Sequence, residues 1–197
     1  MALKGYSALV KAQSSAIALT NEPTTSGDNK SYQITNTAKR ILDFDTPLVV
    51  KDGGVPVTGY SVSRINGTVT FPTSATRIIT ITGAYVTLAT VAEASEFAFD
   101  GITETGDATV FSETNRKYLP TLNSATATIT QFYDVDGFFL GVLFDNAIKV
   151  VELYADSGGD PFRFYALVSA DSITASIDSL TIESITLQAT NKMIVEA

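Results

Sequence analysis

The sequence predicts a mainly β protein: two packed antiparallel sheets in a sandwich or barrel-like arrangement, with one short flanking α-helix. Three observations favour this class. Thr and Ser supply more than a fifth of the 197 residues, and hydroxyl residues that alternate with apolar ones are typical of half-buried strands. Glycine-containing turn sequences separate the alternating runs. Several runs change phase by one residue, which is typical of bulged and strongly twisted strands.

The composition indicates a globular chain and excludes several kinds of site. With 197 residues, 45% of them hydrophobic, we expect one domain over residues 1–197 with a substantial core. The chain has no Cys and no His, which excludes disulfides, zinc fingers, iron–sulfur clusters and Ser-His-Asp triads. We therefore predict a protein that is not an enzyme and that holds no metal and no cofactor.

The apolar runs are too short to cross a bilayer, so no membrane span is expected. Lys11 interrupts the apolar stretch near the N-terminus before it reaches the length of a secretory segment. The sequence thus predicts no signal peptide, and synthesis and assembly in a cytoplasm.

Two hairpins are predicted in the first half of the chain, after a flexible polar loop or arm at residues 21–36. The first covers residues 47–57 and turns at Asp52-Gly53-Gly54. The second covers residues 60–71, where Asn66-Gly67 separates two alternating runs and favours a type I′ turn. That turn would place Val62 opposite Phe71. We expect the whole region 40–72 to protrude.

The next strands are predicted from alternation and its interruptions. Residues 77–90 form an extended run whose apolar positions change phase at Gly83, which indicates a bulge or corner. Residues 96–99 and 108–111 are expected to be short strands beside turns at Asp100-Gly101 and Gly106-Asp107. Residues 124–133 alternate small or apolar residues with Thr, which predicts a half-buried strand.

The last third predicts one helix and a meander. Residues 136–146 contain an eight-residue apolar run between a possible N-cap, Asp136, and a stop, Asn146; a buried strand remains the alternative. Residues 148–154 and 162–168 read as strands around an Asp156–Asp160 turn. Residues 173–177 then turn at Asp178-Ser179 into a strand over 180–188, with a second phase change expected at Glu183-Ser184.

Paired carboxylates and an acidic turn are the chemical candidates. Asp43 with Asp45, and Asp134 with Asp136 if that strand extends so far, would share a strand face. A hydrolase that uses paired carboxylates needs two such groups in one cleft, one with a raised and one with a lowered pKa. Solvated loops are the favoured interpretation, because no basic partner or aromatic platform lies nearby. The oxygen-rich Asp156–Asp160 segment could hold Ca²⁺, although a plain hairpin turn is favoured.

Charge is distributed unevenly along the chain. Residues 1–90 hold eight basic and five acidic side chains, or +3, whereas residues 91–197 hold five basic and sixteen acidic, or −11, which together give −8. Such asymmetry suggests that one copy docks on another through opposite charges; ordinary solvation of two surfaces is the alternative. The sparse basic residues argue against a nucleic-acid binding patch.

The order of patterns in residues 93–190 resembles the major tail tube proteins of long-tailed (siphovirus-type) bacteriophages. The stretch contains an acidic β region leading to residues 113–120, a Thr-rich strand that ends at Phe132-Tyr133-Asp134, and an apolar helix-like run. The strand over 148–154, the Asp-Ser-Gly-Gly-Asp turn and a closing pair of strands follow.

This resemblance implies a structural virion protein of the tail, assembled in the host bacterial cytoplasm. Homohexameric rings would stack into a hollow tube, through which DNA passes without specific binding. The implied partners are further copies of the chain and the tape measure, tail tip and terminator proteins. An acidic, hydroxyl-rich wall would repel phosphate and stay wet, as a conduit for DNA requires.

Two sets of contact residues follow from the charge pattern and the hairpins. In the stacked rings that the resemblance implies, the basic hairpin region 40–72 and the polar segment 21–36 are expected to contact neighbouring rings or subunits, with candidate residues Lys51, Asp52, Gly53, Arg64, Asn66 and Gly67. The acidic half is expected to supply the lumen or the ring faces, through Asp100, Glu104, Asp107, Glu113, Asp171 and Glu183.

Other functions remain open at this point. A phage head–tail connector, terminator or decoration protein would share the architecture without forming long tubes. A carbohydrate-binding or adhesin β-sandwich belongs to a different class, and would be expected to carry exposed aromatic residues and a secretion signal. A glycosidase that uses paired carboxylates is the third alternative.

Overall fold

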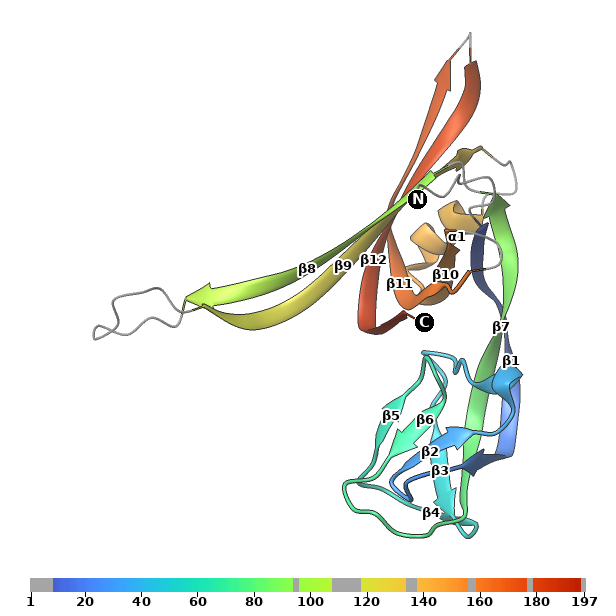
Figure 1. Ribbon diagram of the computed structural model, residues 1–197. Helices are drawn as coiled ribbons and strands as arrows, with labels where there is room; N and C mark the ends of the chain where they lie inside the picture. Colours follow the sequence, from blue (N-terminus) through green and yellow to red (C-terminus); the bar gives the residue numbers. More distant parts are fainter. Residues whose placement is uncertain are drawn as a thin grey trace, which may run out of the picture.

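The computed structural model describes residues 9–93, 96–107, 118–133, 138–155, 159–176 and 179–195. Figure 1 shows a small lobe around strands β2 to β6 and, above it, a main sheet with one helix. Two long strands, β1 and β7, run through both parts. The prediction of a mainly β fold with antiparallel strands and one helix is confirmed.

The described residues form twelve strands, one α-helix and one 3-10 helix. They are β1 (Leu9–Thr25), β2 (Ser31–Ile34), a 3-10 helix η1 (Thr37–Lys39), β3 (Val49–Asp52), β4 (Val55–Pro56), β5 (Ser61–Ser63), β6 (Thr68–Thr70), β7 (Ile79–Glu93), β8 (Glu96–Asp107), β9 (Tyr118–Phe132), α1 (Phe138–Asp145), β10 (Lys149–Tyr154), β11 (Phe162–Ser176) and β12 (Ser179–Val195).

The strands pair in the order β4-β3-β7-β1-β10-β11-β12-β9-β8, with β2, β5 and β6 off this path. The main sheet is strongly curled, because Phe99 of β8 stacks on Phe162 of β11 with 5.4 Å between ring centroids. Two strands, β12 and β9, lie between β8 and β11 in the hydrogen-bonded order. Contact across them requires the sheet to curl towards itself without closing.

The small lobe is a two-layer sandwich. The end of β1 pairs with β2, which pairs with β6, while β3 and β4 extend the sheet of β7. Between the layers lies an apolar core to which β1, β2, β3, β6 and β7 all contribute; its fully buried members include Leu19, Ile34, Val69 and Ile81.

The main sheet has its own core beneath α1. Phe139 and Val142 of the helix are buried together with Ile129, Leu153, Phe164 and Ile185 of the strands. The helix predicted over 136–146 is confirmed over Phe138–Asp145, and Asn146 ends it with a left-handed φ of 50°. The proposed N-cap, Asp136, lies outside the described residues.

A third cluster joins the lobe to the main sheet. Ile65 of the lobe is buried against Val86, Val150 and Tyr165. Tyr165 also donates a hydrogen bond of 2.5 Å from its hydroxyl to the carbonyl of Leu42. The lobe is therefore packed firmly on the sheet.

Several predictions for the first half need correction. Residues 21–36 do not form a loop throughout, because β1 continues to Thr25 and β2 begins at Ser31. The hairpin at 49–56 is confirmed, with positive φ at both Gly53 and Gly54.

The second hairpin exists, but its predicted register was wrong. Val62 pairs with Val69 instead of Phe71, and the connection is the four-residue loop 64–67, in which Gly67 has a φ of 62°. The longer loop buries Ile65 in the interface with the main sheet. This burial explains why a two-residue turn does not form.

In the later strands, one predicted phase change is confirmed, whereas a predicted turn is not. The phase change in β7 is confirmed, since Ile79 and Ile81 are buried before Gly83 and Ala84 and Val86 after it. The prediction of a turn at Asp100-Gly101 was wrong, because both residues lie within β8. The expected strand at 108–111 lies outside the described residues.

The C-terminal strands are longer than expected. Residues 162–168 and 173–176 belong to one strand, β11, with a bulge between Val168 and Ala170. The phase change expected at Glu183-Ser184 was wrong: Glu183, Ile185 and Leu187 are all buried, in unbroken alternation. The last strand therefore keeps one face in the core.

Candidate functional site

One face of the main sheet is rich in hydroxyl groups, and its register also places the apolar side chains of Ala98, Ile102 and the Phe132–Ile182 pair on it. Since Thr128 pairs with Ala98 of β8 and with Thr186 of β12, residues two apart along each strand share its face. We call these residues the hydroxyl face: Glu96, Asp100, Ser124, Thr126, Thr128, Thr130, Ser172, Ser184 and Thr186. The opposite face of the same strands holds the core residues Ala127, Ile129 and Ile185.

The electrostatic character of the hydroxyl face is negative. Asp100 is exposed on β8, as is Glu96. The strand segments that build this face, 96–107, 124–132, 170–176 and 180–188, contain no Lys or Arg. A polyanion would therefore find no phosphate-binding cation on these segments.

Two hairpins project from the main sheet in different directions (Figure 1). The arm is the part of the β8–β9 hairpin beyond the β12 pairing, residues 101–107 and 118–125. The ribbon is the part of the β11–β12 hairpin beyond the β9 pairing, residues 175–176 and 179–181. Both are two-stranded, and such pairs are marginally stable in water unless something packs on them.

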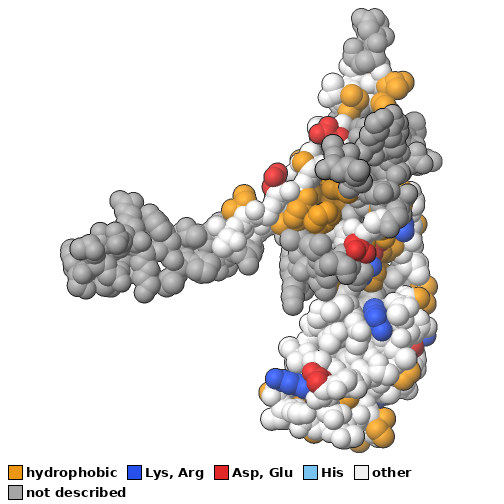
Figure 2. Space-filling view, in the orientation of Figure 1, with side chains coloured by type: hydrophobic (Ala, Val, Ile, Leu, Met, Phe, Trp, Pro, Cys, Tyr) orange, Lys and Arg blue, Asp and Glu red, His pale blue; other side chains and the backbone are white. Residues whose placement is uncertain are grey.

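An apolar strip lies at the base of the ribbon. Ile182 pairs with Phe132 on the neighbouring strand, and Leu180 is two residues further along the same face of β12. The exposed fractions are 40% for Ile182, 57% for Phe132 and 69% for Leu180. Figure 2 shows hydrophobic side chains gathered at this end of the molecule. Contiguous exposed apolar residues of this kind mark interaction surfaces.

The two ends of the described sheet differ in how they are protected. β4 is two residues long and contains Pro56, a proline being a common way to block further pairing at an edge. β8 has twelve residues without proline. Its outer edge is therefore available for pairing with another chain.

The far end of the small lobe exposes a second group of apolar side chains, which we call the lobe tip. It consists of Val49 and Val55 in the β3–β4 hairpin and Ile78 before β7, and Ile78 is 74% exposed. An ion pair between Arg77 and Asp52, 3.1 Å long, lies beside them. The tip is thus an apolar patch beside opposite charges.

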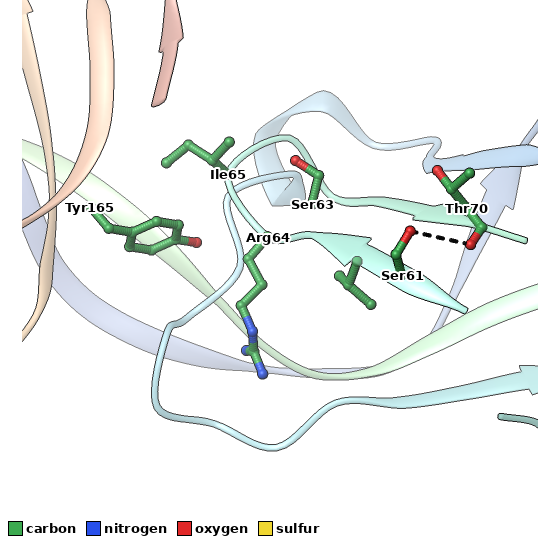
Figure 3. A pocket seen from close by; sticks show the side chains of 7 residues that line it. Ser61, Ser63, Arg64, Ile65, Thr70 and Tyr165 are labelled. Atoms are coloured by element: carbon green, nitrogen blue, oxygen red, sulfur yellow. Dashed lines mark hydrogen bonds between the residues drawn. The ribbon is translucent and has the colours of Figure 1, made fainter. Parts of the chain in front are cut away.

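The seam between the lobe and the main sheet contains a cavity of about 330 Å³ (Figure 3). Two hydrogen bonds fix the Arg64 side chain at this seam, because one guanidinium nitrogen donates to the backbone carbonyls of Asp43 and Thr46. Burial raises the pKa of Tyr165 well above its usual value. No carboxylate lines the cavity, whose lining residues are Ser61, Val62, Ser63, Arg64, Ile65, Thr70 and Tyr165.

Asp43 is the centre of the polar contacts at this seam. It accepts hydrogen bonds from the Thr46 backbone, from the Thr46 hydroxyl and from Gln13 of β1. Burial alone would raise the pKa of Asp43, but these hydrogen bonds and the charge of Lys149 outweigh it and hold the pKa below its usual value. The carboxylate fixes the lobe on the sheet.

The residues predicted for contacts between rings divide into exposed and internal ones. Lys51 is at the lobe tip and donates to the Asn21 side chain, and Asp52 and Gly53 follow it in the β3–β4 hairpin. Arg64 and Gly67 lie instead at internal contacts within the chain. Asn66 is half-buried, and its carbonyl accepts from Gln33.

The residues predicted for an acidic surface are also divided. Asp100 belongs to the hydroxyl face. Glu104 and Asp107 lie in β8, and Glu113 lies outside the described residues. Asp171 and Glu183 point to the core side of the sheet, where Glu183 has an exposed fraction of 0%. Neither contributes to the surface of the hydroxyl face.

The alternation of residues in the last strand could have indicated that Glu183 is buried. Glu183 shares the period of two with Ile185 and Leu187, but the apolar residues Leu180 and Ile182 fall on the other phase, and we therefore expected a phase change at Glu183-Ser184. Burial, followed by the Glu183 charge, raises the pKa of Asp171 to about 6.

The alternative chemical sites receive no support from the described residues. Asp43 is buried in the seam while Asp45 is exposed, so they do not form a pair in one cleft. Asp134 and Asp136, and part of the Asp156–Asp160 turn, lie outside the described ranges. Within those ranges no three His, Cys, Asp or Glu residues gather as a metal site. No helix there is long and apolar enough to span a membrane.

No protein-family model matches the chain, and no curated protein matches it either. Solved structures do match. The chain is similar to a protein in the tail of an empty GTA particle with C6 symmetry, at 14% identity and a TM-score of 0.50, over 56% of this chain and 87% of that chain. A second match, from the virion of a native gene transfer agent (GTA) particle, has 14% identity, a TM-score of 0.49 and covers 56% and 89%. The first likeness shows a shared fold.

Proposed function

We propose that this chain is a structural subunit of a phage-type tail tube, in which six copies form a ring and rings stack into a hollow tube. The observation that carries this proposal is the fold shared with a tail protein of a particle with C6 symmetry. The proposed subunit acts by assembly and has no catalytic role. It would reside in the virion, after assembly in the host cytoplasm.

The hydroxyl face is the proposed wall of the lumen. Its Thr and Ser side chains hold water, and Asp100 and Glu96 give it negative charge. DNA carries dense negative charge, so a wall without Lys or Arg lets it pass without sticking. Tubes should therefore fail to retain DNA in co-sedimentation at about 0.15 M salt, and retention would contradict this assignment of the wall.

The exposed edge of β8, the arm and the apolar strip are the proposed contacts within a ring. An open edge and an apolar surface are both covered when the neighbouring copy pairs with them. Other proteins of the tail, namely the tape measure, the tail tip and the terminator, are the proposed partners at the ends and in the lumen.

Negative-stain electron microscopy of the purified full chain tests the proposal. Rings with sixfold symmetry and tubes of stacked rings are expected. The variant Ile182→Asp should remain folded but monomeric, because a charge in the apolar strip would have to be buried on assembly. Ile17→Asp is the matched control, since Ile17 is also 40% exposed but lies on β1, away from the strip.

Circular dichroism and light scattering separate folding from assembly. A wild-type chain that stays monomeric at high concentration would contradict the proposal. Rings that never stack would favour a head–tail connector, a terminator or a decoration protein.

A further inference from the structure

Three polar side chains meet on the core side of the main sheet: Gln131 of β9, Glu183 of β12 and Asp171 of β11. Gln131 and Glu183 are directly paired, and the Gln131 amide nitrogen donates a hydrogen bond of 2.5 Å to one carboxylate oxygen of Glu183. Asp171 pairs with Ile185, one position diagonal from Glu183 on the same face. Three neighbouring strands thus bring two carboxyl groups and an amide together.

Four oxygen atoms of this group are buried without a hydrogen-bond donor. They are both carboxylate oxygens of Asp171, the second carboxylate oxygen of Glu183 and the amide oxygen of Gln131. The residues Gln131 and Glu183 are 5% and 0% exposed. Buried acceptors with no donor destabilise a fold, and adjacent carboxylates add repulsion.

Within the described residues, no Lys or Arg forms an ion pair with Asp171 or Glu183. The charged group that acts on Asp171 is Glu183, which is another carboxyl group. Its two carboxylate oxygens have almost no contact with solvent. The group therefore has a surplus of acceptor oxygens and of negative charge in the same place.

We propose that Gln131, Asp171 and Glu183 form a binding site for a divalent cation of the calcium type. Carboxylate and amide oxygens are the ligands that hard cations prefer, and Ca²⁺ tolerates irregular sets of six to eight oxygens. A Ca²⁺ ion would give the four unpaired oxygens a partner and neutralise both carboxylates. Water or backbone carbonyls would complete its coordination.

The location gives the cation a structural consequence. The β9–β12 pairing reaches its end one rung further on, at Ile182 and Phe132, and from there β11 and β12 continue alone as the ribbon. A cation bound to β9, β11 and β12 together would fix the base of the ribbon against the sheet. It would also position the apolar strip, whose members Ile182 and Phe132 form that last rung.

Thermal unfolding and terbium luminescence test the site on the full chain after treatment with EDTA and dialysis. Added Ca²⁺ should raise the melting temperature by about 5 to 10 °C at concentrations a hundredfold above its dissociation constant, because it binds the folded state alone. Tb³⁺ should bind with tyrosine-sensitised emission, since Tyr133 is close in the chain to Gln131, and excess Ca²⁺ should displace it.

Variants assign the effect to these residues. Glu183→Gln keeps the side-chain shape and should abolish both the Ca²⁺-induced shift and the Tb³⁺ emission, while the metal-free variant melts no lower than wild type because the repulsion is gone. Asp171→Asn should do the same. Asp100→Asn removes an exposed carboxylate on β8 and should leave both signals unchanged.

The opposite results would overturn the proposal. They are no cation response in wild type, or a response that survives in both Glu183→Gln and Asp171→Asn. If the metal-free protein is instead stabilised only by acidification through about pH 6, the two carboxyl groups share a proton and no cation is bound.

Discussion

At the scale of single residues, Gly67 occupies a position that no side chain can enter without cost. Its φ is 62°, and a Cβ atom there would lie 2.7 Å from the carbonyl oxygen of Arg40. Gly67→Ala should therefore lower the free energy of unfolding by about 2 to 4 kcal/mol, from left-handed strain and a backbone clash together. Urea denaturation measures this loss.

Gly53→Ala is the matched control for Gly67→Ala. Gly53 has nearly the same φ, 55°, but open space around the position of a Cβ. Its substitution should cost about 1 kcal/mol, from strain alone. Equal losses in the two variants would show that the approach of Arg40 to Gly67 has no energetic weight.

Asp43 makes the stability of the seam depend on pH. The pKa of Asp43 is held below its usual value in the folded chain, so its contribution is present above the unfolded pKa and is lost as the pH falls through the folded pKa. Asp43→Asn should cost about 1 to 3 kcal/mol near neutral pH, because the amide matches the Thr46 and Gln13 donors less well. The difference from wild type should shrink near pH 3.

Unfolding in urea at the two pH values measures the Asp43 effect. A difference between Asp43→Asn and wild type that stays constant from neutral to acid pH would mean that the carboxylate charge has no role in the seam. Asp45→Asn, at an exposed position two residues away, should show no difference at either pH.

At the scale of elements, the loop 64–67 joins the small lobe to the main sheet. It places Ile65, 1% exposed, between the lobe and Tyr165 of the main sheet. Ile65→Ala should cost about 2 to 4 kcal/mol, since the interface cannot collapse around the missing atoms. Val55→Ala, an exposed truncation elsewhere in the lobe, should change stability by less than about 0.5 kcal/mol.

Calorimetry also tests whether the lobe and the main sheet unfold together. One transition is expected for wild type, because the third apolar cluster and the Tyr165 hydroxyl join the two parts. Ile65→Ala should shift or split that transition. An unshifted single transition would contradict the role given to the loop.

Local turn chemistry decided one hairpin and failed for the other. At 53–54 two glycines with positive φ connect β3 to β4 as the sequence predicted. At 66–67 an equally good turn sequence is overridden, because burying Ile65 outweighs the preference for a two-residue connection. Turn propensity thus determines the connection of the hairpin that faces solvent, whereas side-chain burial determines the connection of the packed one.

At the scale of the whole molecule, the lobe tip and the ribbon are expected to serve different contacts. We propose, as the charge pattern suggests, that the 40–72 region contacts the neighbouring ring. The double variant Val55→Asp with Ile78→Asp should then form rings that do not stack, because it charges an apolar patch at the lobe tip. Ring and tube counts in electron micrographs measure the effect.

Comparison with the apolar strip makes the test of stacking specific. Ile182→Asp should abolish the rings themselves, whereas the lobe-tip variant should leave them intact. If the lobe-tip variant forms long tubes, the proposal that the lobe tip contacts the neighbouring ring is wrong.

The hydroxyl face illustrates what alternation can predict. Thr126, Thr128 and Thr130 alternate with Ala125, Ala127 and Ile129, and the structure places the first group opposite the core. The sequence thus indicated a wet face on β9. It did not indicate that β8 and β12 extend that face, since strand order depends on contacts between residues far apart in the chain.

The sequence by itself determined the fold class, most strands and the absence of thiol and imidazole chemistry, and it favoured the helix that stops at Asn146 over a buried strand. These features follow from residue types and from local periodicity, which depends only on residues close together in the chain. Only the tertiary structure decided the register at Val62, the continuity of β8 and β11, and the burial of Asp171 and Glu183. Each depends on which distant strand lies opposite, and the free energy of burying side chains across strands sets that choice.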